Sequence, residues 1–191
     1  MDRWRKKRQV MKRYDSTAHL YDVRYEAEQK AKYSTALNNL PPKTLGLVLD
    51  AGCGTGLLFE HVAVSTEAVV GLDISKKTLL QARDRAKNSR NVHLILADAD
   101  HMPFTQDTFD HVFAITLIQN SPDPIETLNE VLRVVRNDAI VVVTGLKRVF
   151  SMTDFKKLLQ KVGLRIIALE GEGLQCHVAV CVKYSTESEK I

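Results

Sequence analysis

Short polar stretches at four places in the sequence carry residue types suited to binding a nucleoside. The first is the run LDAGCGTG, in which Asp50 precedes three glycines at alternate positions. Glycine lets a chain turn sharply and lets a ligand approach the backbone closely. Asp73, Asp98 and Asn120 mark the other three places. Because a carboxylate can accept hydrogen bonds on both oxygens, Asp73 suits the two hydroxyls of a ribose.

The spacing of the glycines separates two classes of nucleotide-binding protein. A dinucleotide-binding turn reads G-x-G-x-x-G, with an acidic residue about 20 positions later for the ribose. This chain reads G-C-G-T-G, and Leu57 stands where the third glycine should be. Asp73 nevertheless follows Gly52 at the distance expected of the ribose-binding acid. The sequence therefore predicts a ligand that contains a ribose but lacks the pyrophosphate of a dinucleotide.

Strand and helix patterns alternate along the chain and predict how these stretches are positioned. Continuous apolar runs predict buried strands, and amphipathic segments between them predict helices. Strands are expected at 45–52, 68–74, 92–100, 109–118, 139–146, 164–171 and 175–184, and helices at 16–40, 55–64, 75–89, 123–135 and 151–163. Such a pattern predicts a doubly wound α/β sheet, mostly parallel, whose last two strands form an antiparallel hairpin. In these sheets ligands bind at the carboxyl ends of the strands, where all four polar stretches fall.

The order and distances of these motifs resemble those of class I S-adenosylmethionine-dependent methyltransferases. The resemblance rests on LDAGCGTG, VVGLDIS, LILADADHMPF and FDHVFAITLIQNSPDP, and it runs from about residue 14 to the C-terminus. It implies a Rossmann-like sheet of seven strands in the order 3-2-1-4-5-7-6, with strand seven antiparallel. It also implies that the cofactor is S-adenosyl-L-methionine and that the protein is a methyltransferase.

The resemblance assigns cofactor contacts residue by residue. Gly52 and Gly54 would let main-chain atoms pass against the methionine portion, with Asp50 near its amino group. Asp73 would accept hydrogen bonds from both ribose hydroxyls.

The adenine end of the cofactor falls to residues after the second and third strands. Asp98 would accept a hydrogen bond from the adenine amino group, and the backbone N–H of Ala99 would face the ring. Ile74 would pack against the adenine, and Tyr21, ahead of the first strand, would close over the cofactor.

The stretch after the fourth strand, Asn120-Ser121-Pro122-Asp123, is expected to face the methyl acceptor. It resembles the Asn/Asp-Pro-Pro-aromatic motif of nitrogen methyltransferases but lacks the aromatic residue. It also resembles the loop of small-molecule C- and O-methyltransferases. In both alignments Asn120 is the first candidate for a catalytic role, with Gln119 and Asp123 behind it. Neither a metal site nor a Ser-His-Asp arrangement is predicted.

Positive charge is concentrated at the N-terminus, where residues 1–13 carry seven Lys or Arg and one Asp. We predict a basic tail over 1–13 and a single methyltransferase domain over 14–191. The tail can serve solubility, bind the phosphates of a nucleic acid, or contact a membrane surface. The favoured function is N-methylation of a base in tRNA or rRNA. Methylation of a small molecule at carbon or oxygen, methylation of a protein, and a noncatalytic cofactor-binding module remain alternatives.

The strand order that the resemblance implies places the third strand at an edge of the sheet, and the sequence of this strand, VHLIL, is apolar. A bare apolar edge strand favours pairing with another chain. We therefore expect a small activator subunit, as in compact RNA and translation-factor methyltransferases, or a homodimer at this edge. With three cysteines, no CxxC spacing and no apolar run of about 20 residues, a cytoplasmic protein with reduced thiols is expected.

Overall fold

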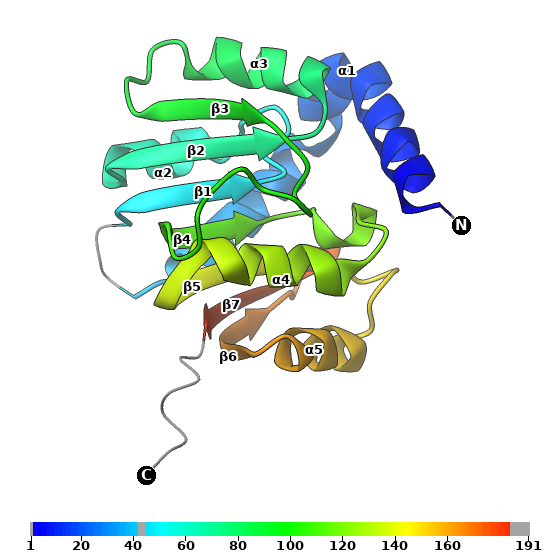
Figure 1. Ribbon diagram of the computed structural model, residues 1–191, viewed down its shortest axis with the longest axis vertical. Coiled ribbons are helices and arrows are strands. Elements are labelled where there is room, and N and C mark those ends of the chain that lie inside the picture. The colour runs from blue at the N-terminus through cyan, green and yellow to red at the C-terminus, as the bar shows by residue number, and fades with distance from the viewer. Residues whose placement is uncertain (1, 42–44, 184–191) are drawn as a thin grey trace.

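Seven strands form one sheet with helices on both of its faces (Figure 1). The computed structural model describes residues 2–41 and 45–183. The strands are β1 (Leu47–Ala51), β2 (Ala68–Asp73), β3 (Val92–Leu96), β4 (Phe109–Ala114), β5 (Val135–Leu146), β6 (Leu164–Glu170) and β7 (Cys176–Lys183). The helices are α1 (Arg3–Asn38), α2 (Phe59–Val62), α3 (Lys76–Ala86), α4 (Pro124–Val134) and α5 (Met152–Lys161), with short 3-10 turns η1 (Ala63–Ser65) and η2 (Ile118–Asn120).

The strand order in the sheet is β3-β2-β1-β4-β5-β7-β6. All neighbours pair in parallel except β7, which runs antiparallel to both β5 and β6. The predicted order and the predicted terminal hairpin are both confirmed. The prediction for the last strand extends to Tyr184, which lies outside the described residues.

The core has two parts, one on each face of the sheet. Phe59 and Val62 of α2, Leu79 of α3 and Tyr33 of α1 pack on one face. On the other face, α4 and α5 contribute Leu128, Val131, Phe155 and Leu159 to a second apolar cluster. Burying both faces explains why the strands read as continuous apolar runs.

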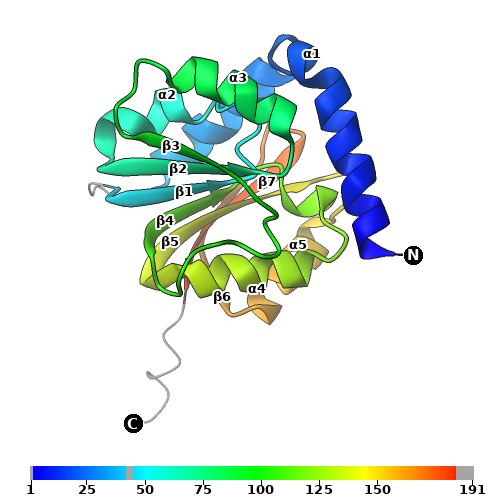
Figure 2. The ribbon, with the colours of Figure 1, turned by 45° about the horizontal axis from the view of Figure 1, so that its top comes forward.

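Helix α1 begins far earlier than the sequence indicated. The prediction of a start near Ser16 is wrong, because the helix already begins at Arg3, where the Asp2 side chain caps it by accepting a hydrogen bond from Trp4 N. The N-terminal half of α1 passes across the carboxyl ends of the strands, which point toward it in Figure 2. Residues 3–13 of the predicted tail are therefore the start of a helix that covers the expected ligand-binding edge.

Several further elements differ in extent from their predictions. The segment predicted as a helix over 55–64 forms only α2 and η1, because the tight turn before Leu58 uses its first residues and a 3-10 turn ends it. Strand β5 starts at Val135 directly after α4, earlier than the predicted 139, and its pairing with β4 shifts register near His111. Strands β3 and β4 end at Leu96 and Ala114, each four residues before its predicted end, and the residues beyond them form the loops that carry Asp98 and Asn120.

Candidate functional site

The glycine run forms a tight turn directly after β1. Gly52, Gly54 and Gly56 all have positive φ values, of 77°, 55° and 78°. Such values are strained for residues with a side chain. A Cβ atom added to Gly54 would meet nothing within 4 Å, so open space lies beside its backbone. The turn therefore leaves room for a ligand to approach the main chain at Gly54.

Asp73 ends β2 and faces this turn. Its Oδ2 accepts a hydrogen bond from Gly54 N at 2.9 Å, and its Oδ1 accepts one from Ser75 N at 2.8 Å. Burial raises the pKa of Asp73, and the N–H groups of Ser75 and Gly54 partly oppose that rise. Because both oxygens are fixed by main-chain donors, the carboxylate is pre-oriented and keeps lone pairs for two ligand hydroxyls.

Asp50 lies in β1 with 4% of its surface exposed. Burial, and after it the nearby charge of Asp73, raises the pKa of Asp50 from 3.8 to about 8. Without a ligand the Asp50 carboxyl therefore carries a proton at neutral pH. A cationic ligand group beside it would favour the ionised form.

The raised pKa of Asp50 predicts a pH-dependent stability. The folded protein holds the Asp50 proton up to about pH 8, whereas the unfolded chain releases it near pH 4, so this group's contribution to stability is lost as pH rises between those values. Asp50→Asn removes the titration. We expect the melting temperature of Asp50→Asn to exceed that of the wild type by a margin that grows from pH 4 to pH 8. Each kcal/mol of unfolding free energy that the wild type loses over this range should add roughly 2–4 °C to the margin.

Thermal unfolding without cofactor, followed by circular dichroism across this pH range, measures that margin. The exposed Asp84 on α3 provides a matched control, since Asp84→Asn should follow the wild type at every pH. A margin for Asp50→Asn that stays constant from pH 4 to pH 8 would contradict the assignment.

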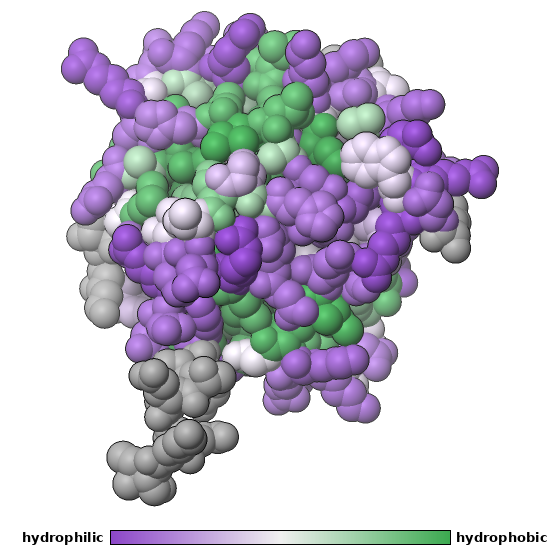
Figure 3. Space-filling view, in the orientation of Figure 1, coloured by the Kyte–Doolittle hydropathy of each residue, from purple (hydrophilic) through white to green (hydrophobic). Residues whose placement is uncertain are grey.

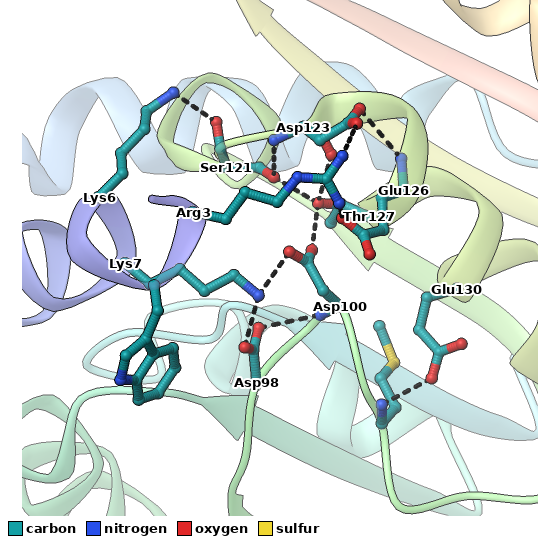
Figure 4. Close-up of polar contacts among 12 residues, drawn as sticks. Arg3, Lys6, Lys7, Asp98, Asp100, Ser121, Asp123, Glu126, Thr127 and Glu130 are labelled. Atoms are coloured by element: carbon teal, nitrogen blue, oxygen red, sulfur yellow. Dashed lines mark hydrogen bonds and ion pairs between the residues drawn. The ribbon is translucent and has the colours of Figure 1, made fainter. Parts of the chain in front are cut away.

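The loop after β3 carries two carboxylates that meet a lysine from α1. Lys7 Nζ lies 2.5 Å from Asp98 Oδ2 and 2.6 Å from Asp100 Oδ2, as Figure 4 shows. Burial lowers the pKa of Lys7, but hydrogen bonds and attraction from Asp100 and Asp98 outweigh that effect and leave it raised. Lys7 thus stays charged and joins the N-terminal part of α1 to the expected adenine end of the site.

Other side chains anchor α1 to the loops after β1, β2 and β4. Asp22 accepts a hydrogen bond from Thr55, and Asp15 accepts one from Ser75 at 2.6 Å. Near the start of α4, Arg3 pairs with Asp123 at 2.8 Å and also with Glu126, again visible in Figure 4. Polar contacts with all four loops therefore hold α1 over the carboxyl edge of the sheet.

A cavity of about 100 Å³ lies beneath this part of α1. Seven of the eight residues predicted to bind the cofactor line it: Tyr21, Gly52, Gly54, Asp73, Ile74, Asp98 and Ala99. The eighth, Asp50, is buried in β1 behind the glycine turn. The structure thus brings together residues that lie far apart in the sequence.

The three residues predicted to act on the methyl acceptor separate in the structure. Asn120 lines the first cavity and also a second, larger one, and Gln119 lines the second. Asp123 lines neither, because its side chain caps α4 by accepting hydrogen bonds from Ile125 N and Glu126 N. We therefore keep Asn120 and Gln119 as candidates at the acceptor and assign Asp123 to the helix start.

Thr116 and Lys32 are among the polar residues of these cavities that were not predicted from the sequence. Thr116 follows β4, lines both cavities and has a φ of 62°, which is unusual for a β-branched residue. Lys32 is 3% exposed and lines the second cavity. A signal for Lys32 did exist, since it shares a helical stripe with the buried residues Gln29, Tyr33 and Ala36.

Within the described residues, no group of three His, Cys, Asp or Glu side chains is placed to hold a metal ion. The three cysteines, Cys53, Cys176 and Cys181, are buried free thiols. No helix in the described part of the chain is long and apolar enough to cross a membrane.

The sheet order, the glycine turn and the oriented carboxylate of Asp73 together define a Rossmann-like nucleoside site of the methyltransferase type. The open space beside Gly54 and the apolar walls of Leu72, Ile74 and Ala99 fit the methionine and adenine portions of S-adenosylmethionine. Residues 49–143 match the family model described as a methyltransferase domain. The chain therefore carries a methyltransferase domain, and S-adenosylmethionine is the cofactor that its site fits.

A curated relative is also a methyltransferase. Malonyl-[acyl-carrier protein] O-methyltransferase of Marinomonas sp. is 32% identical over 155 residues, which cover 79% of this chain and 56% of that protein. The chain thus spans about half the length of this curated relative.

Two solved structures show the same fold. A putative methyltransferase in complex with the Trm112 activator of Haloferax volcanii has a TM-score of 0.83 and 16% identity, covering 94% of this chain and 100% of that one. Magnesium protoporphyrin IX methyltransferase of Synechocystis, solved with S-adenosylmethionine bound, has a TM-score of 0.75 and 19% identity, covering 96% and 98%.

Proposed function

We propose that this protein methylates a small molecule bound in the second cavity. The observation that carries the proposal is that the two cavities share one wall, formed by Tyr14, Tyr21, Thr116 and Asn120. An acceptor in the second cavity would therefore lie next to the cofactor. The second cavity measures about 350 Å³, within the range of about 300–1,000 Å³ that small-molecule sites occupy.

Bound S-adenosylmethionine supplies an electrophilic methyl group: an acceptor lone pair forms the new bond to the methyl carbon as the carbon–sulfur bond breaks and leaves its electrons on sulfur. We propose that Gly52, Gly54 and Asp50 hold the methionine end of the cofactor. Asp73 would hold the ribose. Asp98, with Ala99 and Ile74 beside it, would hold the adenine, and Tyr21 would close over the cofactor.

The proposed role of the chain at the acceptor is alignment in a dry site. Orientation of reacting groups can supply about 7–11 kcal/mol of the barrier. Burial raises the pKa of both Tyr14 and Tyr21, so these phenols stay protonated at neutral pH. They can donate or accept hydrogen bonds but are poor general bases. We propose that Asn120 and Gln119, whose amides do not titrate, orient the acceptor.

RNA is the competing acceptor. The basic residues of the first 13 positions suggest phosphate binding, and Arg5, Arg8 and Lys12 are exposed along α1. Against this, four of the seven basic residues already contact other groups of the protein. Arg3 contacts Asp123, Lys6 contacts Ser121, Lys7 contacts Asp98 and Arg13 contacts Asn120. More than half of the basic residues of this segment therefore already have partners within the fold, which favours the small-molecule proposal.

We also propose that a small activator subunit pairs with the free edge of β3. Leu96 of β3 is 57% exposed, and Leu80 on the neighbouring α3 is 41% exposed. Hydrophobic side chains gather over β3 and α3 in Figure 3. A solved methyltransferase that shares the fold is in complex with an activator, which supports the proposal of such a partner. A second copy of the chain at the same edge is the alternative.

A transfer assay tests the proposed function. The protein is incubated with tritiated S-adenosylmethionine and with RNA, protein or small-molecule fractions from cells that lack it, with and without lysate to supply a missing subunit. We expect label in the small-molecule fraction. Label in RNA would instead support base methylation, and label in protein would contradict both. Cofactor binding without label in any fraction would indicate a noncatalytic module.

A further inference from the structure

The second cavity has an unusual balance of charge. It lies between α1, the loop after β4 and the residues after β5. Four cationic side chains line it, namely Arg13, Arg24, Lys32 and Arg148, against one acidic side chain, Glu28. Clefts lined by one sign of charge attract ligands of the opposite sign. The excess is therefore a first indication of an anionic ligand.

Lys32 is the buried member of this set. Its Nζ donates a hydrogen bond to Thr116 Oγ1 at 3.2 Å, and the nearest carboxylate oxygen, Glu28 Oε1, lies 3.9 Å away. That same oxygen accepts a hydrogen bond from Gln175 N at 3.1 Å. Lys32 also opposes the burial that raises the pKa of the Cys176 thiol. A buried ammonium without a short ion pair is costly, and a ligand anion would compensate for it.

Thr116 is held in its strained conformation from several directions. Its N–H donates to Thr144 Oγ1 at 2.7 Å, and its carbonyl accepts from Asn120 Nδ2 at 2.7 Å. Its hydroxyl meets both Lys32 and Gln29 of α1. Strained residues that the surrounding structure fixes this firmly cluster at functional sites. The Thr116 hydroxyl thus sits at the wall between the two cavities, beside the buried ammonium.

Gln119 adds an independent observation. Its Oε1 is buried and has no hydrogen-bond partner in the described part of the chain, and the residue lines the same cavity. Buried polar atoms in proteins are nearly always paired. A bound molecule with a donor would satisfy this oxygen, and rotation of the amide would instead present its NH2 group to an anion.

We propose that the second cavity binds the methyl acceptor through an anionic group, a carboxylate or a phosphate, on Lys32 and Thr116. The exposed Arg24 and Arg148 attract that group at the entrance. This inference rests on the proposed function, because it names the chemical class of the acceptor. The atom to be methylated then lies on the side of the acceptor that faces Asn120 and the cofactor cavity.

Anion titrations of the full chain test the proposal without requiring turnover. The protein is saturated with S-adenosylhomocysteine, and inorganic phosphate and acetate are titrated in separate arms while backbone amide shifts are followed by NMR. We expect saturable binding of at least one anion. Lys32→Met replaces the ammonium with an apolar side chain of similar length and should weaken anion binding by at least about tenfold.

Two further variants keep the test sharp. Arg148→Glu should weaken anion binding, whereas Arg83→Glu, at an exposed position on α3, should leave it unchanged. The arm that binds more tightly identifies carboxylate or phosphate as the class. Anion binding that is absent from the wild type, or equal in Lys32→Met, overturns this inference. A protein that fails to bind S-adenosylhomocysteine at all would instead overturn the proposed function.

Discussion

Replacing Asp73 by alanine lowers the affinity for S-adenosylmethionine by at least about 100-fold. The carboxylate would accept two ribose hydrogen bonds, and bonds to a charged partner contribute roughly 1.5–3 kcal/mol each. Their joint loss of about 3–6 kcal/mol corresponds to two or more orders of magnitude in the dissociation constant. Isothermal titration calorimetry with the wild type and Asp73→Ala measures the effect.

The control for Asp73 must separate lost binding from lost folding, because Asp73 also holds Gly54 N and Ser75 N. Asp73→Asn keeps one acceptor oxygen and a similar shape, so it should bind with intermediate affinity. Asp84→Ala, at an exposed position on α3, should bind like the wild type. If a folded Asp73→Ala protein binds the cofactor within threefold of the wild type, the ribose assignment is incorrect.

Replacing Asn120 by alanine lowers kcat/KM for the acceptor by about 100-fold, the loss that a small misplacement of reacting groups can cause. The Asn120 amide donates to Tyr14 OH at 2.9 Å and to Thr116 O at 2.7 Å, and its Oδ1 accepts from Arg13 at 2.7 Å. It therefore ties the wall between the cavities to α1. Initial rates of tritium transfer into the labelled fraction measure the loss.

The matched control for Asn120 is Asn129→Ala on the exposed side of α4, which should leave the rate unchanged. Cofactor affinity is measured in parallel, because Tyr14 also lines the first cavity. Wild-type turnover in Asn120→Ala, with cofactor affinity intact, would remove Asn120 from the acceptor side.

The strands and the polar residues at their carboxyl ends could be predicted because the sequence patterns that specify them are local. Continuous apolar runs separated by amphipathic segments specify parallel strands covered on both faces. The carboxyl ends of those strands meet at one edge, so Asp73, Asp98 and Asn120 could be expected to converge. The glycine turn was also readable, since positive φ values favour glycine.

The position of residues 3–13 could not be predicted from the sequence. Their composition is that of a solvated tail, but Lys7 meets Asp98 across 91 residues of sequence, and Arg3 meets Asp123 across 120. Such pairs depend on how α1 packs against the finished sheet. Asp123 was misjudged for a related reason, because the same motif that suggests an acceptor loop also suits a helix cap.

The sequence by itself determined the class of fold, the glycine turn after β1 and the carboxylates at the strand ends, because each depends on a local pattern of hydrophobic period or residue type. Tertiary structure alone decided that α1 roofs the site and that Lys32, Thr116 and Arg148 share one cavity. Those residues lie on a helix and on loops after two different strands, and a charge acquires its partners and its desolvation only once the chain has packed.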